Sequence, residues 1–394
     1  MRGYITKRSK NSYSIKISLG KDDTGKYKSQ WVTVKGTKRD AEKRLAELLC
    51  ELDNGTFIKS AKITVAKYLE RWLLDYCKSN LSPRGYERYE SIVWVHLVPN
   101  IGNITLTQLK PEHLQRLYTD KLNEGKSPLT VKYIHTVIHK ALQTALKWGL
   151  LNRNAANGVD IPKAHHKDMQ VWDDFEVRHF LEAIKDSEYF PLFYTALFTG
   201  ARRSELLALR WSDIDFLFCQ MSISRSLHHL KDGSYIFTEP KSAKSKRTIA
   251  LSPDAIHVLR EHQARQEVKW ATIGKLLTNN DLVFSALRYV GNTVEAKPLC
   301  PNTVSRAWTM LATKAGLKAI RLHDARHTHA TLMLKSGIHP KIVQERLGHA
   351  SIQITLDTYS HVTPGLQEAA AARFDKLIFP KYNDATENEP VEKY

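Results

Sequence analysis

Cysteines and long hydrophobic runs are both scarce in this sequence of 394 residues. The four cysteines are far apart and none forms a Cys-x-x-Cys pair, which argues against a disulfide framework and against a cysteine-based zinc site. No stretch approaches the roughly 18 consecutive apolar residues of a transmembrane helix, and the N-terminus has no apolar segment typical of a signal peptide. We therefore expect a protein of the reducing cytoplasm.

Acidic residues are also few relative to basic ones. The chain has 59 Lys and Arg against 41 Asp and Glu, which gives a formal net charge of +18. Such an excess favours a polyanionic partner, most often nucleic acid. A membrane surface fits less well, because no basic amphipathic helix or lipidation signal is present. The hydrophobic fraction of 42% is enough for ordinary packed cores.

Residues 1–58 are predicted to form a small sheet followed by one helix. Two alternating stretches around a Lys-Asp-Asp-Thr-Gly-Lys turn indicate strands, and Thr37 is a good N-cap for the helix. Residues 1–50 contain 13 basic and 5 acidic residues, and a sheet can present such side chains to the DNA major groove. The candidate DNA-binding residues here are Lys7, Arg8, Lys16 and Lys28.

The next two predicted regions are a helical bundle over 62–152 and an interdomain linker over 153–170. Apolar stripes and two Ser-Pro openings indicate four helices. Lys132 and Lys140 lie on the polar face of the last of these helices and are candidate DNA contacts. The linker is polar and interrupted by Gly and Pro.

Residues 171–380 have a mixed pattern. We predict helices up to about residue 215, three strands over 220–251, and helix again up to about Phe379. The remaining residues, 381–394, form an acidic tail that is predicted to be disordered.

Four local clusters in this last region carry reactive side chains: TGARRSE (199–205), PKSAKSKR (240–247), HDARH (323–327) and LGHASIQITLDTYSH (347–361). Each cluster taken alone is a weak signal, because most such residues are structural. Together, in this order and spacing, they resemble the tyrosine recombinase (phage integrase) family. The joint pattern Arg…Lys…His-x-x-Arg…His…Tyr is specific, and the resemblance covers nearly the whole chain.

The resemblance implies a mixed, mainly α-helical fold with three DNA-contacting parts. Residues 1–58 would be an arm-type DNA-binding domain, a three-stranded sheet with a helix. Residues 62–152 would be a SAM-like core-type DNA-binding bundle, and residues 171–380 an α+β catalytic domain.

It also implies which residues react. A tyrosine phenolate can attack phosphorus and store the phosphodiester energy in a covalent link, and guanidiniums suit the charge that builds up on phosphate oxygens. By resemblance, Arg202 and Arg326 clamp the scissile phosphate and Tyr359 is the nucleophile. The other implied roles are general acid for Lys241, proton transfer for His323, hydrogen bonding to a phosphate oxygen for His349, and support of the arginines for Glu205.

Two of these assignments require a choice between residues that lie close together in the sequence. The family pattern Thr-Gly-x-Arg selects Arg202 over Arg203, and we favour Lys241 over Lys244 and Lys246 as the acid. Arg203, Lys244 and Lys246 are instead candidate contacts to the DNA backbone. Ala325 departs from the leucine that is more usual in this motif.

Three rival hypotheses are weaker. His323 and His327 have the i, i+4 spacing of zinc hydrolases, but the glutamate of His-Glu-x-x-His is absent and Arg326 would lie beside the cation. A catalytically silent DNA-binding architectural protein would not need the complete reactive set. A chromosome- or plasmid-dimer-resolving recombinase, or a type IB topoisomerase, shares the chemistry, but resolvases typically lack a basic sheet like that of residues 1–58.

The resemblance therefore implies an integrase of a temperate phage or integrative conjugative element. It would act through a 3′-phosphotyrosine and a Holliday junction, without metal, cofactor or ATP. Its partners would be double-stranded DNA at core and arm sites, three further copies of itself in a tetramer, and possible DNA-bending and directionality proteins. Its location would be the cytoplasm, on the nucleoid.

Overall fold

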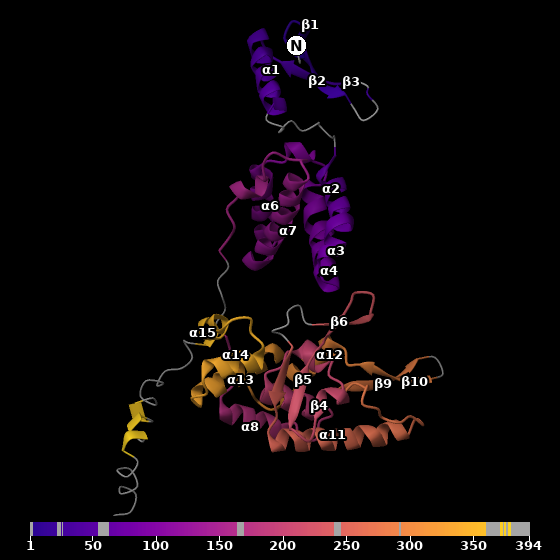
Figure 1. Cartoon of the computed structure of the whole chain (residues 1–394), viewed down its shortest axis with the longest axis vertical. Coiled ribbons are helices and arrows are strands. Elements are labelled where there is room, and N and C mark those ends of the chain that lie inside the picture. Colours follow the sequence, from indigo (N-terminus) through magenta and orange to yellow (C-terminus); the bar gives the residue numbers. More distant parts are fainter. Residues whose placement is uncertain are drawn as a thin grey trace, which may run out of the picture. The chain divides into compact units, whose positions relative to one another are not determined.

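The computed structural model describes residues 3–21, 25, 27–53, 63–163, 169–239, 246–290 and 293–359, and the short pieces 371–372, 374–375 and 377–379. The chain divides into two compact units, Met1–His166 and Lys167–Tyr394 (Figure 1). The fold is mixed and mainly helical, as expected from the resemblance. No helix among the described residues is long and apolar enough to cross a membrane.

The N-terminal part of the first unit is a three-stranded antiparallel sheet with one helix, as predicted. The strands β1 (Gly3–Ser9), β2 (Ser12–Lys21) and β3 (Tyr27–Lys35) pair in the order β1-β2-β3, and α1 (Lys38–Asp53) packs on one face. Ile15, Ile17 and Leu48 form the small core between them. The Thr37 hydroxyl accepts a hydrogen bond from the Asp40 amide (3.3 Å), so the predicted N-cap is confirmed.

The open face of this sheet carries a row of side chains that crosses all three strands. Tyr4 pairs with Lys16, and Lys16 pairs with Trp31. The Lys16 ammonium lies 5.7 Å from the Tyr4 ring centroid and 5.4 Å from that of Trp31, and both rings are about half exposed. Because side chains alternate along a strand, Lys7 and Lys28 point to the other side of the sheet, the side of the α1 core.

The rest of the first unit is a bundle of four helices, as predicted. The first helix comprises α2 (Val65–Trp72), a π-helical turn η1 (Leu73–Cys77) and α3 (Lys78–Asn80). The second comprises α4 (Pro83–Ile92), a π-helical turn η2 (Val93–Leu97) and α5 (Val98–Ile101). The others are α6 (Pro111–Asn123) and α7 (Pro128–Lys147), with short 3-10 turns η3 (Leu106–Gln108) and η4 (Ala155–Gly158).

Serine N-caps begin two helices of this bundle, and a tryptophan is buried in its core. The hydroxyls of Ser82 and Ser127 accept hydrogen bonds from the amides of Gly85 and Thr130, so both Ser-Pro pairs open helices. Trp72 is fully buried. The bundle also includes the beginning of the segment that we expected to be a linker. Ala155 and Ala156 are buried in its core, and the side-chain Nδ2 of Asn154 donates to the His139 carbonyl.

In the described residues of the second unit, helices are combined with three small sheets. Between residues 169 and 359, the helices of its described part are α8 (Asp174–Ala183), α9 (Phe190–Thr199), α10 (Arg203–Leu206), η5 (Trp211–Asp213), α11 (Pro253–Ala271), α12 (Pro301–Lys314), α13 (Leu322–Lys335), α14 (Pro340–Leu347) and α15 (Ile352–Tyr359). The strands β4 (Ile214–Asp215), β5 (Gln220–Ile223) and β8 (Arg247–Ala250) form one sheet; β6 (Ser226–His229) pairs with β7 (Tyr235–Thr238), and β9 (Ser285–Val290) with β10 (Thr293–Pro298).

The core of this unit is aromatic. Trp172 and Trp308 stack with ring centroids 5.1 Å apart, and Phe180 and Phe193 pack around them. The helices α9 and α13 pack against each other in this unit. Arg202 follows the end of α9, and Arg326 lies near the start of α13.

Three of the predicted elements were wrong. The described residues between 220 and 250 form four strands and not three, because Ser226–His229 and Tyr235–Thr238 make a hairpin of their own. The region 285–298, predicted to be helical, is the β9–β10 hairpin. The predicted helix after Gly200 is only the four residues of α10, followed by turns.

Candidate active site

The first arginine of the site stands at a sharp turn between α9 and α10. Gly200 has φ of +62°, and a Cβ there would lie 2.7 Å from Leu347 Cδ2, so the position requires glycine. Arg202 is the N-cap of α10. Its amide donates to Glu205 Oε2 (2.8 Å) and its guanidinium Nη1 to Glu205 Oε1 (2.8 Å). Glu205 is buried while the Arg202 side chain stays 37% exposed, so the carboxylate anchors an arginine that faces outward.

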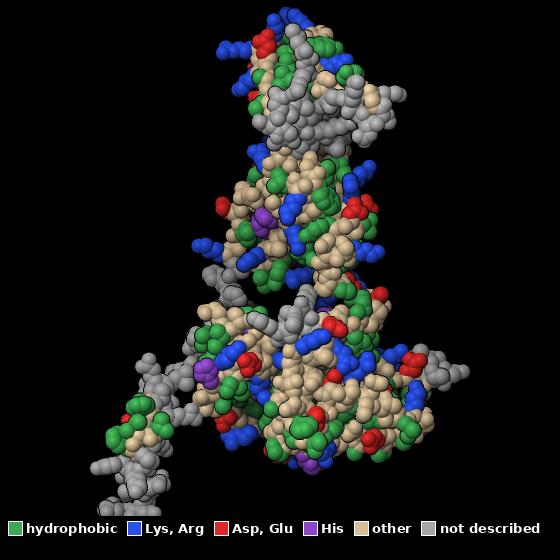
Figure 2. Space-filling model, in the orientation of Figure 1, with side chains coloured by type: hydrophobic (Ala, Val, Ile, Leu, Met, Phe, Trp, Pro, Cys, Tyr) green, Lys and Arg blue, Asp and Glu red, His purple; other side chains and the backbone are tan. Residues whose placement is uncertain are grey.

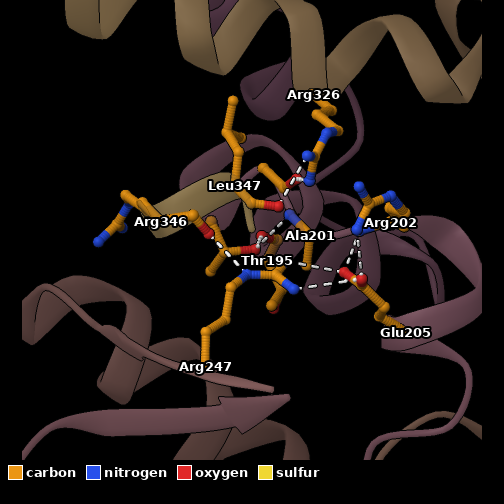
Figure 3. A network of polar contacts seen from close by, with 10 residues as sticks. Thr195, Ala201, Arg202, Glu205, Arg247, Arg326, Arg346 and Leu347 are labelled. Atoms are coloured by element: carbon orange, nitrogen blue, oxygen red, sulfur yellow. Dashed lines mark hydrogen bonds and ion pairs between the residues drawn. The ribbon is translucent and has the colours of Figure 1, made fainter. Parts of the chain in front are cut away.

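Glu205 has a second arginine partner that our sequence analysis missed. Arg247, the first residue of β8, donates from Nη2 to Glu205 Oε2 (2.8 Å) and from Nη1 to Oε1 (3.2 Å) (Figure 3). Burial alone would raise the pKa of the Glu205 carboxyl, but the hydrogen bonds and charge of Arg247, with those of Arg202, lower it. One signal was available in the sequence: Arg247 shares a face of its strand with buried Ile249, and a charged residue on a core-facing position requires a partner.

The second predicted arginine comes from α13. Arg326 is only 3% exposed, and its guanidinium donates from Nη1 to the Gly200 carbonyl (2.9 Å) and from Nη2 to the Leu347 carbonyl (2.7 Å). Arg326 therefore bonds to the turn that carries Arg202 and to the end of α14 (Figure 3). The structure thus brings together two arginines that are 124 positions apart in the sequence (326 − 202).

A fourth arginine, Arg346, ties α14 to the body of the unit. Its Nη1 donates to the Ala250 carbonyl, its Nη2 to the Phe198 carbonyl (2.9 Å each), and its Nε to His329 Nε2 (3.1 Å). Because arginine can only donate, His329 must accept at Nε2 and carry its proton on Nδ1, which donates to the Leu197 carbonyl. His329 is therefore neutral, and burial, with the nearby Arg346 charge, lowers its pKa to about 3.

This geometry predicts acid lability. Since the pKa of His329 is about 3 in the folded chain and 6.5 ordinarily, the unfolded chain binds a proton that the folded chain does not. Stability conferred by neutral His329 is thus complete above pH 6.5 and is lost as the pH falls towards 3. His329→Gln keeps an acceptor for Arg346 but does not titrate. We expect its thermal midpoint, followed by circular dichroism, to fall less steeply on acidification than that of the wild type; parallel curves would contradict this assignment.

His349 lies in the turn after α14. Gly348 ends the helix with φ of +67°, and α15 begins only at Ile352, so His349 lies in the turn between these two helices. Its Nδ1 is 2.9 Å from the Thr355 hydroxyl, and its amide donates to the Gln344 carbonyl. Burial, followed by the charges of Arg326 and Arg202, lowers the pKa of His349 to about 4, so the imidazole is neutral at pH 7.

His323 is on α13, one turn before Arg326. Its ring is in edge contact with that of His327, with centroids 5.0 Å apart. Burial and then the charge of Arg326 lower the pKa of His323. For His327, burial and then His323 lower the pKa to about 4. Among the residues that the structure describes, no group of three or more His, Cys, Asp or Glu side chains could hold a metal ion.

The remaining predicted site residues are only partly described. Lys241 and Lys244 lie outside the described residues. Tyr359 is the last residue of α15, and its side chain lies outside what is described. Lys246 is exposed and pairs with Glu239 at 2.8 Å. Arg203 Nη1 donates to the Pro301 carbonyl and to Ser305 at the start of α12, and its contact with the DNA backbone stays a prediction.

The predicted DNA-binding residues of the first unit lie on its surface. The sheet carries Lys7, Arg8, Lys16 and Lys28. Arg8 lies where the β1–β2 register is irregular. On α7, Lys132 is exposed, and the Lys140 ammonium lies 5.9 Å from the Tyr76 ring centroid. Figure 2 shows more basic than acidic side chains on the visible face of the helical bundle.

Comparison with known proteins identifies the family. A model described as "Phage integrase family" matches residues 171–365, and one described as "Phage integrase, N-terminal SAM-like domain" matches residues 64–122. The chain therefore belongs to the phage integrase family. It is a site-specific tyrosine recombinase, an enzyme that cuts and rejoins DNA strands to integrate mobile elements.

Two relatives match the chain over nearly its whole length. A protein named "Tyrosine recombinase XerC-like" from Caldanaerobacter subterraneus subsp. tengcongensis is 27% identical over 390 residues, covering 94% of this chain and 98% of the relative. The ICEBs1 integrase of Bacillus subtilis is 26% identical over 376 residues, covering 95% of this chain and all of the relative (100%).

Solved structures share the fold. The Tn1549 transposon integrase in complex with a circular intermediate DNA has a TM-score of 0.64 at 18% identity, and the match covers 80% of this chain and 99% of that one. A lambda integrase dimer bound to a COC' core site has a TM-score of 0.55 at 16% identity, with 99% and 97% covered.

Proposed function

We propose that Tyr359 is the nucleophile of this recombinase and that Arg202 and Arg326 bind the scissile phosphate. The observation that carries the proposal is that Arg326 connects the two turns that bear Arg202 and His349. Its guanidinium donates to the carbonyls of Gly200 and Leu347. Gly200 lies two residues before Arg202, and Leu347 lies two residues before His349. Three polar groups suited to phosphate, from three segments, are thus held by shared backbone contacts.

The step is a transesterification. The Tyr359 oxygen attacks phosphorus, an O–P bond forms to the 3′ phosphate, and the bond from phosphorus to the 5′ oxygen breaks. The phenolic proton must leave, and the 5′ oxygen must gain one. His323 fits the first requirement, because its lowered pKa leaves a neutral imidazole that can accept a proton. We assign the second to Lys241. Rejoining is the reverse reaction with a 5′ hydroxyl from the partner duplex.

The connection from His349 to α15 supports the placement of the nucleophile. Thr355 is fully buried and hydrogen-bonded to His349. Position 359 follows position 355 by four residues, and such positions lie on the same side of an α-helix. The helix that ends at Tyr359 is therefore fastened to the site on that side.

The other parts would deliver DNA to this site. The sheet would bind arm sites through its open face, where the row of Tyr4, Lys16 and Trp31 offers one cation between two exposed aromatic rings. The helical bundle and the second unit would bind core sites. A homotetramer on a Holliday junction, acting on the nucleoid with bending and directionality proteins, completes the proposal; a lambda integrase tetramer bound to a Holliday junction shares the fold, with a TM-score of 0.54.

One experiment with two proteins tests this function. Full-length protein is incubated with a nicked core-site duplex, from which the cleaved strand's short 5′-hydroxyl piece diffuses away, and covalent adducts are counted on denaturing gels. We expect an adduct with the full chain and with a chain lacking residues 1–58, but recombination between full attachment sites with the full chain alone. Failure of the full chain to form any adduct refutes the enzyme; recombination by the truncated chain refutes the arm-site role.

A further inference from the structure

Arg247 joins three segments of the active site through one guanidinium. Two of its nitrogens bond the Glu205 carboxylate, and Nε donates to the carbonyl of Arg346 at the end of α14 (2.7 Å). The side chain is only 6% exposed. In Figure 3 the guanidinium of Arg247 lies between Glu205 on one side and the Arg346 backbone on the other.

Arg247 also packs against the residue that precedes His349. A Cβ built on Gly348 would lie 3.0 Å from both Cδ and Nη1 of Arg247. The turn that presents His349 therefore rests directly on this side chain. In addition, the carbonyls of Arg346 and Leu347, two acceptors in the last turn of α14, are taken by Arg247 and Arg326 respectively, which satisfies helix-end groups that have no partner within the helix.

The carboxylate of Glu205 needs this second partner. It is 5% exposed, and its other arginine, Arg202, is 37% exposed. A buried carboxylate that loses a hydrogen-bonded cation either becomes protonated or pulls its remaining partner closer. Either change would redirect the Arg202 donors away from the phosphate that we assign to them.

We propose that Arg247 is a positioning residue for strand cleavage. It does not contact the phosphate; it fixes the Glu205 carboxylate that orients Arg202 and supports the turn that carries His349, so that both side chains meet one phosphate. This inference rests on the proposed function of the site.

Four single variants of the full chain and one double variant test it. Arg247→Lys keeps the charge but loses the planar fork that makes three directed bonds, Arg247→Met removes the charge, and Glu205→Gln removes the carboxylate. The matched control is Arg225→Lys, because Arg225 forms another partly buried ion pair of this unit, with Asp213 at 2.6 Å. Affinity for a core-site duplex is measured with Tyr359→Phe added, cleavage as single-turnover adduct formation at saturating protein, and folding as the thermal midpoint.

We expect Arg247→Lys to retain DNA affinity within about threefold while cleavage slows by roughly 10- to 100-fold, since misplaced catalytic groups affect the bound reaction and not binding. Arg225→Lys should lower the thermal midpoint at least as much and cleave at the wild-type rate. If Arg247 acts through Glu205, the double variant Arg247→Met/Glu205→Gln should be no slower than its slower parent. Wild-type cleavage by Arg247→Lys, or multiplied losses in the double variant, overturns the inference.

A further measurement does not depend on catalysis. Histidine NMR titration of the DNA-free protein should show the pKa of His349 near 4 and a rise towards 6.5 in Arg247→Lys, where the charge remains but the turn loses its support. An unchanged value contradicts the positioning role. If the wild type forms no DNA adduct, the proposed function fails, while this titration still decides whether Arg247 holds the turn.

Discussion

Tyr359→Phe is expected to bind core-site DNA with wild-type affinity and to form no covalent adduct. The substitution removes one oxygen, the atom that we assign to attack phosphorus, and phenylalanine cannot replace it as a nucleophile. Position 359 ends α15, whose attachment depends on Thr355 and His349, so the fold should be unaffected. The readouts are gel-shift affinity, denaturing-gel adducts and the thermal midpoint.

The matched control for this variant is Tyr189→Phe, a tyrosine of the same unit whose ring stacks on Phe193. It should bind and cleave as the wild type does. Any adduct formed by the Tyr359→Phe protein would assign the nucleophile to another residue. Mass spectrometry of the DNA-linked peptide from the wild type would then identify that residue.

Arg202→Ala and Arg326→Ala should both abolish most cleavage but differ in stability. Loss of one preorganised donor to a transition-state oxyanion costs roughly 2.7–4 kcal/mol, or about 10²- to 10³-fold in rate. Arg202 is partly exposed, and when Arg202 is removed Glu205 retains its ion pair with Arg247. Arg326 is buried, and its removal deprives the carbonyls of Gly200 and Leu347 of a donor, at about 1–3 kcal/mol for each buried group left unpaired.

We therefore expect the thermal midpoint to change little in Arg202→Ala and to fall clearly in Arg326→Ala. Arg178→Ala, which removes an exposed pair with Asp174 on α8, is the control and should change neither rate nor midpoint. Cleavage within threefold of the wild type (roughly 0.7 kcal/mol) by either active-site variant would remove that arginine from the phosphate site. Equal loss of stability in both would contradict their different burial.

The sequence predicted most elements of the fold because their signals are local. Serine caps opened the helices of the bundle where Ser82 and Ser127 indicated them. Alternation placed β2 and β3, whereas the third strand of this sheet was expected only from the family resemblance. The β9–β10 hairpin was missed although its second strand, Thr-Val-Glu-Ala-Lys-Pro, contains a β-type alternation; the helices on both sides dominated the interpretation. α10 was predicted to be too long because the turns after Leu206 have no breaker residue.

The site was predictable only as far as its motif extends. Arg202 and Arg326 were assigned through the resemblance of their motifs to the recombinase family, and the structure places them in one network. Arg247 and Arg346 could not be assigned in this way. Their partners include the carbonyls of Arg346, Ala250 and Phe198, and a backbone carbonyl has no sequence signature, because every residue type carries one.

The use of backbone carbonyls as acceptors affects how the enzyme can diverge. Two acceptors of Arg326 are main-chain atoms of Gly200 and Leu347, so no point substitution can delete them. Only a change in the path of the backbone would remove these two contacts. Relatives with different target sites should therefore be free to vary the side chains around Arg326 while inheriting both contacts intact.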